Sequence, residues 1–310
     1  VFWWKLDVVQ KLWPGARLIS DTRGGDGNGL GGLVNSHLNT NWMAGEPKGL
    51  YVSSLLIEQK LFGDELALWA GKMDMCDYFD VNKVASWNFV SLSLAKNPTL
   101  AYPPHALGGI VRYQPRERFY IQAGVVDAQS SFTEIALRSS LDEMISVYGL
   151  GVGTDWGGRE GNYRLIGWYD PRDIARIDGT GMKGNDSGFG LSCDQQLTEK
   201  VTAFFRYGFA DQNVRSIEHF WSAGALTVGP IPGRDKDVLL VGVGQAFMGK
   251  DYQEANSRSM STEVLLEVDY QITISDWFSI SPGIQVIVNP GADKANDTDV
   301  ILGIRASLHV

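Results

Sequence analysis

The stretch Glu263–Thr273, EVLLEVDYQIT, alternates apolar with polar residues. One face carries Leu266, Val268, Tyr270 and Ile272, and the other carries Glu263, Glu267, Asp269, Gln271 and Thr273. A period of two residues indicates a β-strand. Segments 277–288 and 299–310 repeat the pattern. At about 10 to 12 residues, each is long enough to cross a bilayer as a tilted strand.

The composition limits the class of protein. The chain has 310 residues, of which 44% are apolar and 20% charged, and its mean hydropathy is -0.11. No stretch approaches the roughly 20 apolar residues of a membrane-spanning helix, which excludes a helical membrane protein. The 36 Gly, 10 Trp, 11 Tyr and 13 Phe supply turn formers and the aromatic residues that gather at membrane interfaces. A large all-β soluble domain is the alternative.

The net charge and the cysteine content limit the partners and cofactors that the chain can be expected to bind. A net charge of -9 and a pI near 5.0 argue against a nucleic-acid partner, because phosphate binding needs a basic stripe. Cys76 and Cys193 lack the spacing of metal ligands, so we expect free thiols, no metal and no other cofactor. The turn Asp26–Gly29 has oxygens spaced as in a calcium loop, although a solvent-exposed turn is the stronger interpretation.

From residue 51 onward, periodicity and turn residues predict thirteen strands. They cover residues 51–62, 65–73, 108–114, 118–126, 147–155, 161–170, 187–196, 200–210, 219–229, 236–247, 262–273, 277–288 and 299–310. The connections between them alternate between short and long. This rhythm is typical of an up-and-down barrel with tight periplasmic turns and long extracellular loops, and a Greek-key sandwich gives no such rhythm.

The first 50 residues complete the predicted barrel. Three more strands, Lys5 to Leu12, Ala16 to Asp21 and Leu33 to Trp42, bring the total to 16. We therefore expect one domain over residues 1–310: an all-β, transmembrane, antiparallel barrel with both termini at the tight-turn end. A barrel of 16 strands is wide enough to hold an aqueous channel.

The alternation also predicts which side chains face inward. Because lipid demands an apolar outer face, Val201, Ala203, Phe205, Tyr207 and Phe209 should point outward. The interior then receives Thr202 and Arg206 from the same strand. By the same argument it receives Glu58, Lys60, Arg112, Arg164 and Arg305, so charges of both signs would line it. The alternative is a set of solvated charges on the wet face of a soluble sheet.

The run Gly71–Asn82, GKMDMCDYFDVN, resembles the signature of the carbohydrate-selective porins, the OprB family. Further similarity extends from about residue 50 to 305. It includes Asn97-Pro98, Pro103-Pro104, Gly124–Ala128, Asp194–Leu197 and Pro282–Pro290. The chain departs from the family at its ends: it lacks a terminal aromatic residue and its N-terminal stretch is short, so we expect trimmed or partly represented ends.

The resemblance implies an outer-membrane channel for facilitated diffusion of monosaccharides and similar small polar solutes. Its surroundings would be outer-membrane lipids and lipopolysaccharide. Its cargo would be small carbohydrates. The lipid-facing residues would look the same on a monomer as on a trimer contact, so the oligomeric state stays open between the two.

The segment 74–107 is expected to fold into the barrel and narrow it. It mixes carboxylates with aromatic planes, which suits solutes that present hydroxyls and apolar CH faces. The candidate pore-lining residues are Asp74, Asp77, Tyr78, Asp80, Trp87, Arg112, Arg164, Arg206, Glu267, Asp269 and Arg305. The alternative role of this loop is purely structural, with Asp caps and aromatic packing that hold it shut.

Other functions fit less well. A glycosidase could use the carboxylates Glu263, Glu267 and Asp269, but a wet interior does not raise the pKa of one of them as hydrolysis requires. A barrel lipase needs a paired Ser and His, and the chain has four His and no G-x-S-x-G. We therefore expect no enzyme and no catalytic residues. The rivals that stay open are a porin without sugar selectivity and an outer-membrane scaffold with little transport.

Overall fold

The computed structural model describes residues 1–30, 33–256 and 261–309. One antiparallel sheet of 15 strands dominates it. Its strands are β1 (Phe2–Lys11), β2 (Ala16–Asp26), β3 (Gly49–Leu61), β4 (Leu66–Asp74), β5 (His105–Arg116), β6 (Phe119–Val126), β7 (Ile145–Asp155), β8 (Glu160–Asp170), β11 (Asp186–Gln196), β12 (Val201–Ala210), β13 (Ile217–Val228), β14 (Val238–Met248), β15 (Thr262–Ser275), β16 (Phe278–Val288) and β17 (Asp299–Leu308). All thirteen strands predicted beyond residue 50 are present.

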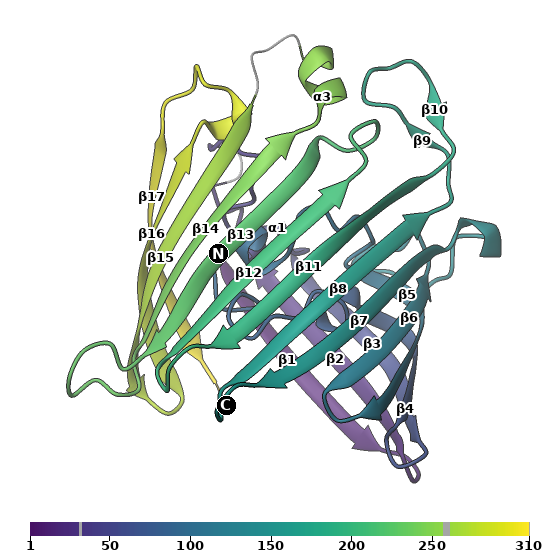
Figure 1. Cartoon of the computed structure of the whole chain (residues 1–310), viewed down its shortest axis with the longest axis horizontal. Helices are drawn as coiled ribbons and strands as arrows, with labels where there is room; N and C mark the ends of the chain where they lie inside the picture. Colours follow the sequence, from purple (N-terminus) through teal and green to yellow (C-terminus); the bar gives the residue numbers. More distant parts are fainter. Residues whose placement is uncertain (31–32, 257–260, 310) are drawn as a thin grey trace.

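Every strand pairs with its neighbour in sequence, apart from the insertion between β8 and β11, so the topology is up-and-down. The sheet curls on itself, with β11–β16 in one wall and β1–β3 in the opposite one (Figure 1). This confirms the predicted all-β, up-and-down antiparallel architecture. No helix in the described part of the chain is long and apolar enough to cross a membrane.

The connections separate a tight-turn end from a long-loop end. Residues 62–65 and 276–277 are typical of the tight turns, and 75–104 and 171–185 of the long loops. The predicted alternation fails at one point, where 211–216 at the long-loop end is shorter than 229–237 at the other end. The C-terminal strand ends among the tight turns (Figure 1).

The prediction for the first 50 residues is partly wrong. β1 and β2 form as expected, but Leu33 to Trp42 is not a strand. The backbone of this segment forms hydrogen bonds with side chains of the barrel wall instead. The segment leads into the short helix α1 (Trp42–Gly45). The sheet thus has 15 strands in place of 16. Because Phe2 pairs with Asp26, Val1 lies at the long-loop end and not, as predicted, at the tight-turn end. Among the described residues, β1 pairs only with β2 and β17 only with β16.

Large apolar side chains mark the tight-turn end. Six of its connections each expose at least one such side chain. The most exposed in each are Trp13, Phe62, Trp156, Leu197, Ile231 and Trp277, at 49 to 76%. Aromatic and apolar residues of this kind settle at the boundary between lipid and water. They place this end of the barrel at a membrane interface.

The buried core lies inside the barrel, between its wall and the segments that fold inward. One cluster joins Phe79 to Ile110 and Ile166 of the wall, and a second joins Phe89 to Phe204. Burial of apolar side chains therefore stabilises loops against the wall, where each large side chain contributes about 1.5–3 kcal/mol.

The other loops carry short elements. The hairpin of β9 (Ile174–Ala175) and β10 (Met182–Lys183) and the helix α3 (Lys250–Ala255) lie at the long-loop end (Figure 1). The connection between β6 and β7 contains the 3-10 helix η2 (Leu141–Glu143), which begins with a Ser140–Glu143 capping box. The remaining elements are η1 (Met75–Asp77), α2 (Leu92–Ala95) and η3 (Pro290–Ala292). Cys76 and Cys193 are free thiols.

Candidate pore constriction

The connection between β4 and β5, residues 75–104, is called the inner loop here because it packs against inward-facing side chains. Polar caps set its local shape. Asp74 accepts a hydrogen bond from the N–H of Cys76 and starts η1, Asn82 accepts from Val84 and Ala85, and Ser91 caps α2. Asp, Asn and Ser stabilise such turns because their side chains satisfy exposed N–H groups.

Arg206 of β12 holds the inner loop from one side. Its guanidinium donates to the carbonyls of Leu94 (3.0 Å), Ala95 (2.7 Å) and Asp80 (2.9 Å), and it lies 3.4 Å from the Asp80 carboxylate. Its side chain is 0% exposed. Arg206 points into the barrel as predicted, but it lies beneath the loop and has no surface open to a solute.

Glu267 of β15 holds the loop from another strand. Its carboxylate accepts the N–H groups of Val90 (2.6 Å) and Ser91 (2.9 Å), and Gln285 donates to it at 2.8 Å. Glu267 is also 0% exposed. A guanidinium that donates to carbonyls on one side and a carboxyl group that accepts N–H groups on the other fix the path of the loop. Each hydrogen bond of the charged guanidinium is worth about 1.5–3 kcal/mol.

Further hydrogen bonds from other strands complete the attachment. Gln122 of β6 donates to the carbonyl of Tyr78, and Arg305 of β17 donates to the carbonyl of Asn88, at 2.7 and 2.9 Å. Asn97 of the loop donates to the carbonyl of Tyr207 at 3.0 Å. The loop is thus tied to several parts of the barrel wall.

A second segment, residues 33–48, folds inward beside the inner loop, and sequence patterns gave no sign of this. Glu263 accepts the N–H of Leu38 at 2.8 Å, and Gln285 donates to the carbonyl of Thr40 at 2.9 Å. Its Trp42 N–H donates to the carbonyl of Val90 at 3.0 Å. The polar residues of this segment pair with the inner wall, which explains why it does not form the predicted strand.

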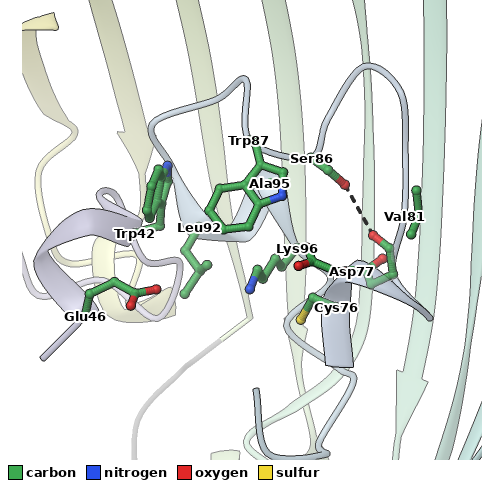
Figure 2. A pocket seen from close by; sticks show the side chains of 11 residues that line it. Trp42, Glu46, Cys76, Asp77, Val81, Ser86, Trp87, Leu92, Ala95 and Lys96 are labelled. Carbon is green, nitrogen blue, oxygen red and sulfur yellow. Dashed lines mark hydrogen bonds between the residues drawn. The ribbon is translucent and has the colours of Figure 1, made fainter. Parts of the chain in front are cut away.

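A cavity of about 110 Å³ lies where the two segments meet. Trp42 and Glu46 of the second segment lie on one side of Lys96, and Asp77 of the inner loop lies on the other, with Trp87 above (Figure 2). The cavity therefore combines two indole rings with carboxylates and an ammonium group. Asp80 lines it too, although its carboxylate is buried against Arg206 and the N–H of Asn97.

Trp87 lies at the centre of an aromatic and cationic cluster. Its ring centroid is 5.2 Å from that of Trp42 and 6.4 Å from that of Trp3. The Arg23 guanidinium lies 5.1 Å from it, and the ammonium groups of Lys5 and Lys96 each 5.5 Å. Trp87 has φ +67°, a conformation that side-chain-bearing residues rarely adopt. Packing and cation–π attraction hold it there.

Arg23 of β2 links this cluster to the wall. It is 0% exposed, and its ion pairs join it to Asp21 (2.8 Å), Asp74 (3.3 Å) and Glu46 (3.4 Å). Lys96 lies 3.5 Å from the same oxygen of Asp74. These residues bring β2, β4 and both inner segments into one charged network.

The network shifts the acid–base behaviour of the loop residues. Burial among protein atoms, followed by the charge of Asp74, raises the pKa of Asp77 to about 6, although this carboxyl is open to the cavity. Burial also raises the pKa of Glu46, against the opposing effect of Arg23. Burial is the largest single effect on the pKa of Lys96 and lowers it, but Asp74, Cys76 and Asp77 together outweigh burial and raise this pKa.

The structure thus divides the expected site residues into groups. Asp77, Asp80 and Trp87 line the cavity, and Asp74 lies behind it. Tyr78 turns towards Trp69, with ring centroids 5.3 Å apart.

The remaining expected residues lie on the wall. Arg164 pairs with Asp194 at 2.7 Å, and Arg112 lies beside Trp69. Arg206, Glu267 and Arg305 hold the loop. Asp269 is buried beside Gly283.

Sequence reasoning missed several residues of the cavity and of the cluster around Trp87. Trp42, Glu46 and Lys96 line the cavity, and Trp3, Lys5 and Arg23 belong to the cluster. Extending the predicted strand 16–21 by two residues would have placed Arg23 on the inward face with Asp21. The others carry no local signal, since they lie together only because the second segment folds inward.

Two oxygens of the Asp26–Gly29 turn have hydrogen-bond partners within the chain. Asp26 accepts from the N–H of Gly27 at 2.7 Å, and Lys48 donates to Asn28. In the described part of the chain, no group of three or more His, Cys, Asp or Glu side chains is placed to hold a metal ion.

The architecture has counterparts of known structure. An OprB of Pseudomonas putida, solved at high pH, superposes with a TM-score of 0.83 at 17% identity, over 94% of this chain and 82% of that one. OmpT of Vibrio cholerae, an outer-membrane protein with loop L8 deleted, gives a TM-score of 0.55 at 12% identity, over 98% and 89%. These matches show a shared outer-membrane barrel fold.

Curated sequences agree. Porin AaxA of Chlamydia pneumoniae is 20% identical over 83% of this chain and 58% of its own length. Porin B of Pseudomonas aeruginosa is 21% identical over 47% of this chain and 40% of its own. The chain thus spans about half the length of these relatives. Residues 23–309 match the family model described as carbohydrate-selective porin, OprB family. Since this match covers most of the sequence, the chain belongs to the OprB family of outer-membrane porins.

Proposed function

We propose that the chain forms a water-filled channel through which monosaccharides and similar small polar solutes cross the outer membrane by facilitated diffusion. The observation that carries the proposal is the cavity between the inner loop and the 33–48 segment. It presents the Trp87 and Trp42 rings together with Asp77, Glu46 and Lys96. A sugar has CH faces that pack on aromatic rings and hydroxyls that both donate and accept hydrogen bonds.

The anchoring of the inner loop supports a fixed constriction. A solute that passes must lose part of its hydration, and mixed polar groups in the cavity can replace those hydrogen bonds. Binding must stay weak, because a tightly held solute would not leave. Side chains paired with one another, such as Lys96 with Asp74, offer moderate rather than strong attraction.

Solute flux into proteoliposomes tests the proposal, with glucose, a disaccharide, an amino acid and a small anion at matched concentration. Fastest entry of glucose is the expected result. Rates ordered by size alone would indicate a general porin and would remove the sugar selectivity. An absence of flux would favour the scaffold alternative.

A further inference from the structure

Arg112 of β5 lies on the inner wall on the tight-turn side of the inner loop. It is paired in register with Ala67 of β4 and Gln122 of β6. Its guanidinium carbon lies 5.2 Å from the ring centroid of Trp69 and 4.6 Å from that of Tyr120. Its Nε donates to Gln122 Oε1 at 2.8 Å. Two aromatic rings and one hydrogen bond therefore fix the orientation of the guanidinium.

Among the described residues, two carboxylates of this wall are each paired with a side chain other than Arg112. Glu58 is used by Arg17, at 2.6 Å, and it also accepts from Trp69 Nε1 at 3.0 Å. Asp194 is used by Arg164, at 2.7 Å. No ion pair within 4.0 Å involves Arg112 in the part of the chain that the structure describes. Arg17 and Arg164 thus occupy these two carboxylates, and Arg112 pairs with neither.

The two Nη groups of Arg112 are open to a ligand. Among the described residues, neither has a hydrogen-bond acceptor, and neither is sealed from solvent. Arg305 also lacks a carboxylate partner, but its Nη2 is used by the carbonyl of Asn88. A guanidinium with two free Nη groups matches a carboxylate, which it binds through two parallel hydrogen bonds.

We infer that Arg112 is an anion subsite below the constriction and that it binds the carboxylate of sugar acids as they leave the cavity. The inference rests on the proposed function, because it assumes that sugars pass the cavity. The rings of Trp69 and Tyr120 already pack on the guanidinium, so the subsite recognises the carboxylate group and not the sugar ring. A neutral sugar gains nothing there.

The test compares galacturonate with galactose, which differ in the carboxylate. The full chain is reconstituted in planar bilayers, and the reduction of KCl current by each sugar gives its affinity. In Arg112→Gln we expect the affinity for galacturonate to fall about tenfold, because charge-assisted hydrogen bonds are lost. The affinity for galactose should stay the same. An equal fall for both sugars would overturn the inference, since it would reflect a change in channel shape.

Arg118→Gln is the matched control. Arg118 carries the same charge in the turn after β5, but it is 51% exposed and pairs with Asp155 at 3.1 Å. Its loss should leave the galacturonate affinity unchanged. An equal effect of both variants would overturn the subsite in favour of a diffuse positive field.

Glu58→Gln guards against misfolding of the first variant. The glutamine side chain can still accept hydrogen bonds from Trp69 and Arg17. Because the substitution removes one negative charge near Arg112, we expect galacturonate to bind more tightly. Weaker or unchanged binding would contradict the inference. If neither sugar reduces the current of the unaltered protein, the proposed function fails, and the permeability ratio of chloride to potassium tests Arg112 alone. That ratio should fall in Arg112→Gln and not in Arg118→Gln, and an unchanged ratio overturns the subsite.

Discussion

The inward charges of the wall and the exposed groups of the cavity look alike in sequence but behave differently in the fold. Arg206 and Glu267 are fully buried and bind loop backbone, whereas Asp77 is open to the cavity and Trp87 partly so. An inward-pointing charge is therefore not in itself a pore-lining one. When a long loop folds into a barrel, the wall residues beneath it become its attachment, and the loop supplies the new lining.

The largest effect should come from removing an attachment. Arg206→Gln leaves the Asp80 carboxylate and several carbonyls buried without their partner, which costs about 3–5 kcal/mol of unfolding free energy. Urea unfolding in detergent micelles measures it, and single-channel conductance should rise as the loop loosens. Lys236→Gln, at an exposed pair with Asp276 away from the inner loop, is the control. Equal stability and conductance of Arg206→Gln and Lys236→Gln would remove the distinction between attachment and lining.

Substitutions on the outer face should reduce stability by a smaller amount, and only when they introduce a charge. Val268 faces outward, in register with Val241 and Ile284. Val268→Arg should destabilise the barrel by about 2–4 kcal/mol in lipid. Gln271→Arg, on the opposite face of the same strand, should be mild. Unfolding in lipid vesicles compares the two, and equal losses would mean that the assigned register is wrong.

A cavity residue should affect transport more than stability. We expect Trp87→Ala to weaken glucose binding by roughly tenfold, in keeping with the 0.5–1.5 kcal/mol of an aromatic contact. Current reduction by glucose measures this. Trp277→Ala removes an exposed indole at the tight-turn end and should leave glucose affinity intact. Similar losses of glucose affinity in both variants would mean that Trp87 does not contact the solute.

The smallest effect should be the pH dependence of ion selectivity. Because the pKa of Asp77 is raised to about 6, its carboxylate is charged above this pH and neutral below it. Selectivity for potassium over chloride should therefore fall as pH drops from 7.5 to 5. The ammonium group of Lys96, whose pKa is raised, stays positive throughout. Asp77→Asn should remove most of this dependence in reversal-potential measurements, and an unchanged pH profile in that variant would exclude Asp77 as its source.

The parts of the site that sequence patterns predicted are those carried by strands or by the family resemblance. Arg112, Arg206 and Glu267 were assigned to the interior because strand residues alternate between faces. Asp77 and Trp87 were found in the long loop whose Gly71–Asn82 run resembles the family. Arg206 and Glu267 were expected to meet solute, because nothing local in a strand shows what covers its inner face.

The second inner segment shows where sequence reasoning stops. Leu33 to Trp42 was predicted as a strand, yet its backbone is satisfied by Glu263 and Gln285, which are more than 200 residues away in sequence. Such pairing leaves no periodic trace. The positions of Trp42 and Glu46 in the cavity were therefore not predicted. These two residues supply one of its indole rings and one of its carboxylates.

The sequence by itself determined the barrel, because a strand in lipid must show an apolar face outward and must pair every backbone group with a neighbour. Those demands repeat every two residues and can be read locally. The tertiary structure alone decided the constriction, because its residues meet through contacts between β2, β12, β15 and two inward-folded segments. Which inward charge holds a loop and which one meets a solute depends on what lies above it, and that is a property of the folded chain.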